Sequence, residues 1–243
     1  MLEIKDLTMA FGGLIAFHDI SFDIKKGQII GLIGPNGAGK TTLINCISGV
    51  YQPIAGDITF KGQSLKKLRP HQICRLGIGR TYQIPRPFLN MTVINNLQVC
   101  SKSRHTEINW LLELTNLWNK RHQLAKTLTF QERRQLEFCR ALSVEPDLLL
   151  LDETIAGLNP AEVEEMMVLL RYVHQKTGIT ILWIEHVMQA IMNNAHHIVV
   201  LHQGSLIARG TPQQIANDSK VIEAYLGEEY QFKKEAETNA AAS

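Results

Sequence analysis

The chain has 243 residues, with 25 Lys and Arg against 23 Asp and Glu and a net charge of +2. Its 45% hydrophobic and 20% charged residues are ordinary for a globular protein with a core, which excludes disorder of the whole chain. The nearly neutral balance does not favour nucleic-acid binding through bulk charge. No apolar run approaches the ~18 residues that span a bilayer, and the N-terminus lacks the apolar core of a signal peptide.

Short strands joined by turns are predicted in the first part of the chain and recur further along. Alternating hydrophobicity indicates strands at 2–7, 20–24 and 57–60. Continuous apolar runs, typical of strands buried on both faces, occupy 28–33, 148–151, 179–184 and 197–201. Buried strands separated by helical stretches predict a parallel sheet in an α/β fold.

The middle of the chain differs, because from about Thr92 to Leu142 the pattern is helical throughout. Pro160, preceded by Asn159 as a cap, predicts the start of a further helix. We expect a single domain with an inserted helical subdomain. Its expected parts are an α/β core at 1–84 and 143–227, a helical subdomain at 85–142, and a disordered tail at 228–243.

A glycine-rich loop follows the predicted strand at 28–33 and fits G-x-x-x-x-G-K-[ST] at every fixed position. Glycines let backbone N–H groups point at one anion, and the N-terminal end of the following helix adds partial positive charge. Lys40 can reach the β- and γ-phosphates, and the Thr41 hydroxyl can bind Mg²⁺. The predicted nucleotide-binding residues are Gly34, Pro35, Asn36, Gly37, Ala38, Gly39, Lys40, Thr41 and Thr42.

Polar side chains follow two more of the predicted buried strands. Asp152 and Glu153 end the run at 148–151; we expect Asp152 to hold Mg²⁺ through water and Glu153 to face the water that attacks the γ-phosphate. His186 follows the strand at 179–184, where an imidazole can bind a phosphate oxygen or orient the carboxylate or water. Taken alone, a histidine at a strand end is more often structural than catalytic.

These three elements together resemble the ATPase subunit of an ABC transporter over about residues 1–227. The glycine loop is similar to the Walker A motif of that family, the acids after the leucine run to its Walker B motif, and His186 to its switch histidine. The resemblance implies that Gln83 is the Q-loop glutamine, which touches Mg²⁺ and joins the core to the helical subdomain. It also implies that Phe11 stacks on adenine. Phe11 could instead belong to the core, and Gln83 could be an ordinary loop residue.

Short strings are similar to the branch of this family that takes up branched-chain amino acids. They are FGGLIAF (11–17), AGLNP (156–160), IEHVM (184–188) and VIEAYLG (221–227). The ATPases of urea transport and of lipopolysaccharide transport look similar. The resemblance implies ATP and Mg²⁺ as cofactors, with Glu153, His186 and Gln83 as catalytic residues and Thr41, Gln83 and Asp152 on the metal.

In this family, two ATPase domains dimerise head to tail and drive transport through separate membrane subunits. The resemblance implies the motor subunit of an importer at the cytoplasmic face of the inner membrane. Its implied partners are a second ATPase subunit of a different chain, two membrane permease subunits and, indirectly, a solute-binding protein, but no nucleic acid. The alternatives are a catalytically weak regulatory subunit, an importer of urea or amides, a lipopolysaccharide-transport ATPase, and a non-transport ATPase acting on DNA or ribosomes.

One motif departs from the family pattern. The signature LSGGQ is replaced here by Leu128, Thr129, Phe130, Gln131 and Glu132. Gln131 stands where the family has the glycine beside the γ-phosphate of the partner's ATP, and a side chain there should crowd it. A weakened electrostatic clamp can cost on the order of 10²–10³ in rate. We therefore expect a heterodimer with one competent and one impaired site; the alternative is that Gln131 turns into solvent and both sites work.

Overall fold

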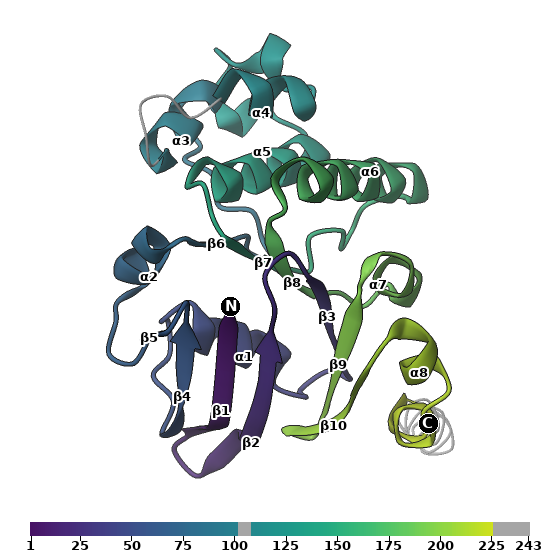
Figure 1. Ribbon diagram of the computed structural model, residues 1–243. Coiled ribbons are helices and arrows are strands. Elements are labelled where there is room, and N and C mark those ends of the chain that lie inside the picture. The colour runs from purple at the N-terminus through teal and green to yellow at the C-terminus, as the bar shows by residue number, and fades with distance from the viewer. Residues whose placement is uncertain (102–107, 226–243) are drawn as a thin grey trace, which may run out of the picture.

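A computed structural model describes residues 1–101 and 108–225, which form two sheets and a layer of helices (Figure 1). The antiparallel sheet has the order β2-β1-β4-β5 and the larger sheet the order β10-β9-β3-β8-β7-β6. The smaller sheet contains β1 (Leu2–Phe11), β2 (Leu14–Ile24), β4 (Ala55–Phe60) and β5 (Gln63–Ser64). The larger contains β3 (Ile29–Ile33), β6 (Ile78–Arg80), β7 (Leu148–Asp152), β8 (Thr180–Ile184), β9 (His197–His202) and β10 (Ser205–Gly210).

The helices surround the larger sheet, with the longest ones above it in Figure 1. They are α1 (Lys40–Ile47), α2 (Pro70–Leu76), α3 (Val93–Cys100), α4 (Ile108–Leu114), α5 (Phe130–Ser143), α6 (Pro160–Thr177), α7 (Met188–Asn194) and α8 (Pro212–Ala216). Two short 3₁₀ helices, η1 (Trp118–Lys120) and η2 (Ala125–Thr127), lie between α4 and α5. None of the helices in the described parts of the chain combines the length and apolarity that a bilayer span requires.

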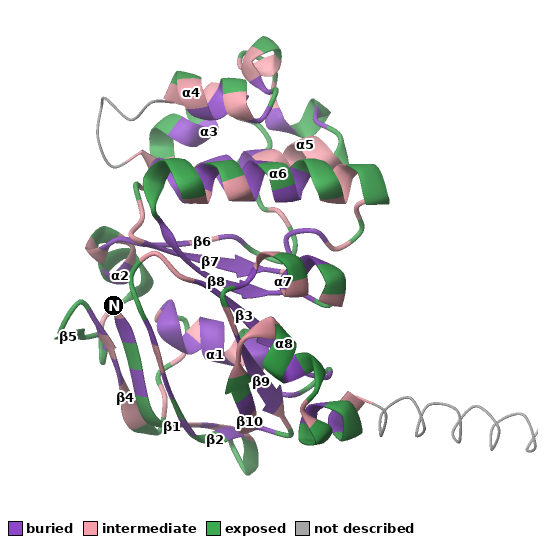
Figure 2. Cartoon of the chain, turned by 45° about the vertical axis from the view of Figure 1, so that its right-hand side comes forward, coloured by how far each residue is buried: buried purple, intermediate pink, exposed green. Residues whose placement is uncertain are grey.

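The larger sheet is the central layer, and Figure 2 shows its inner strands as buried. Successive residues of these strands enter two different hydrophobic cores. In β7, Leu149 and Leu151 pack on the side of α5 and α6, whereas Leu148 and Leu150 pack on the side of α1 and the antiparallel sheet. The strands β3, β8 and β9 alternate in the same way. All residues of β3, β7 and β8 are buried, and β9, β3, β8, β7 and β6 pair in parallel, so the prediction of a parallel sheet covered on both faces is confirmed for these strands. The edge strand β10 pairs antiparallel with β9, so the whole sheet is mixed.

Every predicted strand is present, and several extend beyond the predicted limits. The strands β5, β6 and β10 were not predicted from the sequence. Two of these have only two or three residues, and β10 is a half-exposed edge strand, so none has a clear period or a continuous apolar run.

The prediction that 92–142 is helical throughout is wrong. Irregular chain and the two 3₁₀ helices separate α4 from α5, and Thr92 and Leu124 form an antiparallel bridge. Asn116 has a φ of 58°, a left-handed conformation that no α-helix continues through. Apolar residues at helical spacing therefore pack into one core here without belonging to one helix. The predicted tail at 228–243 lies outside the described residues.

The start of α6 is fixed by a reciprocal cap, as the Asn159-Pro160 pair predicts. The Asn159 side chain accepts a hydrogen bond from the Glu162 amide at 3.1 Å, and the Glu162 carboxylate accepts one from the Asn159 amide at 2.9 Å. Pro160 occupies the first turn, where a missing N–H costs nothing. This cap sets where the chain after β7 turns into α6.

Leu150→Ala tests the buried central strand. The side chain of Leu150 is fully buried, so its removal should leave a cavity and lower the free energy of unfolding by about 2–5 kcal/mol. Val168→Ala on α6 is the matched control, because Val168 is 52% exposed and should change stability by less than ~0.5 kcal/mol. Urea denaturation of both variants measures the difference, and equal losses would contradict this description of the core.

Candidate active site

The glycine loop at 34–39 connects β3 to α1 and lies tightly against neighbouring backbone. Gly34 has a φ of 149°, and a Cβ there would lie 2.0 Å from the carbonyl oxygen of Leu201. Gly39 has a φ of 99°, and its Cβ would lie 2.9 Å from the carbonyl oxygen of Ala16. Only glycine fits both positions, so the path of the loop depends on the two glycines of the motif.

The loop curls around the ammonium group of Lys40. Lys40 is 6% exposed, and its Nζ donates to the carbonyl oxygens of Gly34 at 2.6 Å and Pro35 at 2.8 Å. At the start of α1, Gly39 offers no side-chain cap and no acidic residue occupies the first turn. The loop therefore presents a cation and a helix N-terminus to the same place, an arrangement suited to a polyphosphate.

Asp152 lies at the end of β7, is 2% exposed and pairs with Arg80 at 3.0 Å. Arg80 also donates to Asn45 at 2.7 Å and Ser48 at 2.8 Å, so the α1 helix helps to hold the guanidinium. Burial raises the pKa of the Asp152 carboxyl, and the Arg80 guanidinium and the Thr41 hydroxyl oppose part of that rise. The ion pair thus joins the last strand residue to the helix that follows the glycine loop.

The same carboxylate fits a Mg²⁺ ion. Within the described residues, Asp152 Oδ1 is buried and has no hydrogen-bond partner, although a buried acceptor is normally satisfied. A carboxylate and a hydroxyl oxygen, here Asp152 and Thr41, are ligands that Mg²⁺ prefers, together with water and phosphate oxygens. The unpaired oxygen lies where the sequence predicts the metal.

Glu153 lies between the other two predicted catalytic side chains. Its Oε1 is 2.8 Å from Nε2 of His186, and its Oε2 accepts from Nε2 of Gln83 at 2.5 Å. The Glu153 amide donates to the carbonyl oxygen of Ile184 at 3.0 Å, which fixes the residue to the end of β8. Glu153 also has a φ of 51°, a left-handed conformation uncommon for a residue with a side chain. Two distant segments, one with Gln83 and one with Ile184 and His186, therefore hold this residue and its carboxylate.

Phe11 lies at the end of β1 and outside both hydrophobic cores. It is 45% exposed, and its ring meets that of Tyr51 edge to face, with centroids 5.1 Å apart. An exposed aromatic face held by a second ring is suited to stacking a planar group. Gln83 is also exposed, but its hydrogen bond to Glu153 distinguishes it from an ordinary loop residue.

The five residues that replace LSGGQ form the start of α5. Thr129 and Glu132 cap each other: the hydroxyl accepts from the Glu132 amide at 3.3 Å, and the carboxylate accepts from the Thr129 amide at 3.0 Å. Glu132 also pairs with Lys120. Gln131 does not turn into solvent. Its Nε2 donates to Oε2 of Glu165 on α6 at 2.9 Å.

Buried charged residues that the sequence analysis missed surround this site. Glu185 is 2% exposed and accepts from the Ile155 amide at 2.9 Å and from Trp183 Nε1 at 3.3 Å. Burial raises the pKa of Glu185 to about 7. Arg134, also buried, donates to the carbonyl oxygen of Ala156 at 3.1 Å. Glu185 could have been found from the sequence, because a charged residue directly after a continuous apolar run is a candidate for burial.

Comparisons with known proteins agree with this fold and site. The model of the ABC transporter family matches residues 17–156, and that of the branched-chain amino acid ATP-binding cassette transporter matches 205–231. BraF of Pseudomonas aeruginosa, a high-affinity branched-chain amino acid transport ATP-binding protein, is 39% identical over 94% of this chain and 98% of its own. LivG of Escherichia coli, described in the same words, is 38% identical with the same coverage. The lipopolysaccharide export system ATP-binding protein LptB of Escherichia coli is 32% identical over 95% and 99%.

Solved structures of ATP-binding cassettes share the whole architecture. A nucleotide-free cassette from an ABC transporter superposes with a TM-score of 0.84 at 28% identity, covering 93% of this chain and 98% of its own. A cassette in its ADP conformation gives a TM-score of 0.84 at 29% identity with the same coverage. The chain is therefore an ABC ATPase, a nucleotide-binding protein whose ATP hydrolysis is coupled to transport. Within that family it belongs to the ATP-binding proteins of the branched-chain amino acid transporter branch, and it is part of an ABC transporter complex.

Arg80→Ala tests the buried ion pair. The substitution leaves the carboxylate of Asp152 buried without its cation, so the free energy of unfolding should fall by about 3–5 kcal/mol. Arg209→Ala is the control, because Arg209 forms a pair with Asp23 at 2.8 Å that is largely exposed and should be worth ~0–1 kcal/mol. Chemical denaturation of both variants measures the contrast. Similar losses in the two variants would mean that burial does not strengthen the Arg80 pair.

Glu185→Gln tests the buried acid through pH. The pKa of Glu185 is about 7 in the folded protein, against 4.5 for an ordinary glutamate. The neutral carboxyl that the fold favours is present in both states at low pH. As pH rises toward 7, the unfolded chain ionises first, so the free energy of unfolding falls. The wild type should therefore lose about 3 kcal/mol relative to Glu185→Gln between pH 5 and pH 8. Thermal unfolding across that range measures the difference. For the exposed Glu113→Gln variant, the difference in stability from the wild type should be the same at every pH. A pH-independent difference for Glu185→Gln as well would contradict the buried acid.

Proposed function

We propose that this chain binds ATP with Mg²⁺ and hydrolyses it as the motor subunit of an importer for branched-chain or related neutral amino acids. The observation that carries this proposal is the position of Glu153, held between Gln83 and His186 at the strand ends beside the glycine loop. The loop, the buried Asp152 and this carboxylate are the groups that phosphoryl transfer to water requires.

Nucleotide binding is assigned to the glycine loop and to Phe11. Residues 34–42 surround the phosphates, with the Lys40 ammonium and the N-terminus of α1 compensating their charge. The exposed ring of Phe11 stacks on adenine. Thr41, Asp152 and Gln83 hold the Mg²⁺ site, with Asp152 acting through water. The bound metal neutralises charge that develops on the phosphate oxygens.

Hydrolysis is assigned to Glu153, His186 and Gln83. The Glu153 carboxylate positions the attacking water and accepts its proton. His186, 2.8 Å from Glu153, orients that carboxylate and a γ-phosphate oxygen. Gln83 must exchange its hydrogen bond with Glu153 for the metal, which couples occupancy of the site to the segment that leads into the helical subdomain.

Transport needs further chains. We propose a head-to-tail dimer with a second ATPase subunit, a different chain, in which the start of α5 faces the partner's ATP. Two membrane permease subunits contact the helical subdomain at the cytoplasmic face of the membrane, and a solute-binding protein acts indirectly. Two curated relatives are named for branched-chain amino acid transport and one for lipopolysaccharide export, which supports amino acids as the first candidate.

Glu153→Gln in the complex purified from its own membranes tests this assignment. ATP turnover should fall at least about 100-fold, because the amide cannot accept a proton, while nucleotide binding is retained. Uptake of labelled leucine by cells should fall with it. The matched control is Glu3→Gln on β1, which removes an exposed carboxylate from the antiparallel sheet, outside the helical subdomain, and should change neither measurement.

Two results would contradict the proposal. Normal turnover and uptake in Glu153→Gln would make this chain a regulatory ATP-binding subunit whose own site does not drive transport. Native mass analysis that recovers the chain without membrane subunits would contradict the proposed composition of the complex. Recovery with two membrane subunits and a different ATPase chain is the expected composition.

A further inference from the structure

The start of α5 offers an anion two backbone donors. Among the described residues, the amides of Phe130 and Gln131 have no hydrogen-bond partner, whereas those of Thr129 and Glu132 are satisfied by the reciprocal cap. Free amides in the first turn of a long helix, added to its partial positive charge, attract a phosphate oxygen. A side chain folded across them would compete for the same place. Gln131 is the residue that could do so.

The Gln131 side chain is engaged elsewhere. Its Nε2 donates to Oε2 of Glu165 at 2.9 Å; Gln131 is half-buried and Glu165 is exposed. Glu165 lies in the second turn of α6, which runs beside α5 in both ribbon views (Figures 1 and 2). A hydrogen bond from an amide to a carboxylate is charge-assisted and stronger than one between neutral groups. The bond holds the glutamine amide toward α6.

Neighbouring contacts explain why Gln131 can reach α6. Arg134 donates to the carbonyl oxygen of Ala156 at 3.1 Å, which anchors α5 to the loop that precedes α6. The ring of Phe130 packs on Gly157, where a Cβ would lie 3.4 Å from the ring. These two contacts keep the first turn of α5 beside the start of α6.

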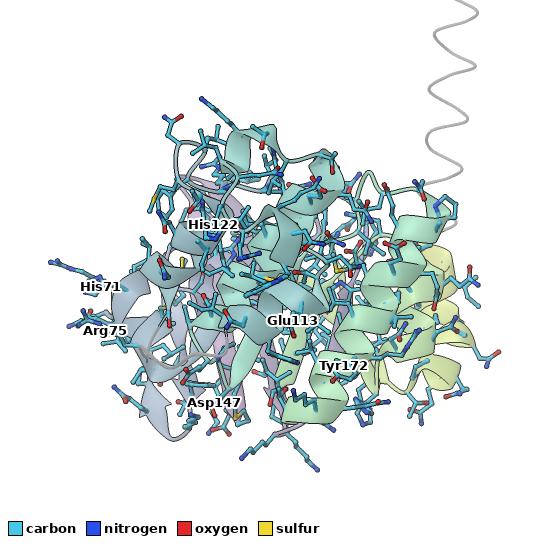
Figure 3. The ribbon with its side chains drawn as sticks, turned by 90° about the horizontal axis from the view of Figure 1, so that it is seen from above. His71, Arg75, Glu113, His122, Asp147 and Tyr172 are labelled. Carbon is cyan, nitrogen blue, oxygen red and sulfur yellow. The ribbon has the colours of Figure 1, made fainter. Side chains whose placement is uncertain are left out.

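Packing does not force the Gln131 side chain into its place. A groove of about 860 Å³ runs between the helices and is lined by Gln135, one turn after Gln131, and by Glu165 itself. Figure 3 looks onto this face and labels Tyr172 of α6, which also lines the groove, and Glu113 of the neighbouring α4. Gln131 is half-buried at the first turn of α5 and does not itself line this groove, so without the hydrogen bond its side chain would be free to adopt other rotamers. The hydrogen bond to Glu165 is what selects this one.

We propose that Glu165 is a positioning residue for the ATP bound to the partner cassette. By holding Gln131 against α6, it leaves the amides of Phe130 and Gln131 open to the γ-phosphate, although the chain lacks the glycine that other members of the family have there. The inference rests on the proposed function, in which the start of α5 faces the partner's ATP. It also makes the partner's site competent, in place of the impaired site expected from the sequence.

A double-mutant cycle in the intact complex tests this inference. Glu165→Ala should lower kcat/KM for ATP by roughly three- to tenfold, the effect of one lost hydrogen bond of about 1 kcal/mol between partly solvated groups. Adding Gln131→Gly should restore it to within about twofold, because no side chain then needs to be held. Glu165→Gln, whose amide oxygen can still accept from Gln131, should stay near the wild type. Glu164→Ala is the matched control, since it removes a carboxylate from the adjacent position of α6 that pairs with Arg171 instead.

Two outcomes would overturn the inference. One is an unchanged kcat/KM in Glu165→Ala. The other is a loss in Glu165→Ala that Gln131→Gly does not rescue, which would make Glu165 a structural residue of α6. If the unmodified complex hydrolyses no ATP, the proposed function itself fails, and this inference fails with it.

Discussion

The parallel pairing of β3, β8 and β7 is the constraint on which the site depends. Ile184 of β8 stands opposite both Leu32 of β3 and Asp152 of β7, so the three strands end at the same level. Their carboxyl ends therefore deliver the glycine loop, the Asp152-Glu153 pair and His186 to one edge of the sheet. Ligands of open α/β sheets bind at this edge for the same geometric reason. Each face of the sheet packs against its own hydrophobic core. A slip of one residue would move every side chain of a strand to the opposite core, so packing on the two faces fixes the register.

The site combines two electrostatic environments. Asp152 and Glu185 are buried among strand ends, and burial raises the pKa of each. The charge of Glu153 acts on both of these acids, and Glu153 itself is held by hydrogen-bond contacts with the exposed side chains of Gln83 and His186. The buried Arg134 experiences the field of both Glu185 and Glu153, and burial is the main cause of its lowered pKa. The scaffold thus surrounds one accessible carboxylate with charges that solvent screens poorly.

The sequence could predict the features that depend on residues close together in the chain. The glycine loop, the two strand-end acids and the Asn159 cap are local patterns with a mechanism at short spacing, and the structure has the loop and the cap as expected. Arg80 and Glu185 were missed because their partners lie 72 and 30 residues away, and no spacing rule relates such positions. Gln131 was recognised as unusual, but its partner Glu165 lies 34 residues away on another helix. The direction of the Gln131 side chain depends on how α5 packs against α6, which the sequence alone does not give.

The segment 156–158 touches the machinery of both ATP sites. It begins three residues after Glu153, it accepts the hydrogen bond from Arg134, and its glycine receives the ring of Phe130. In the proposed heterodimer, which holds one copy of this chain, a defect there would reach the chain's own site and, through α5, the site of the partner. A single change in this segment would therefore silence both sites of the complex, whereas a change confined to Phe11 would leave the partner's site intact.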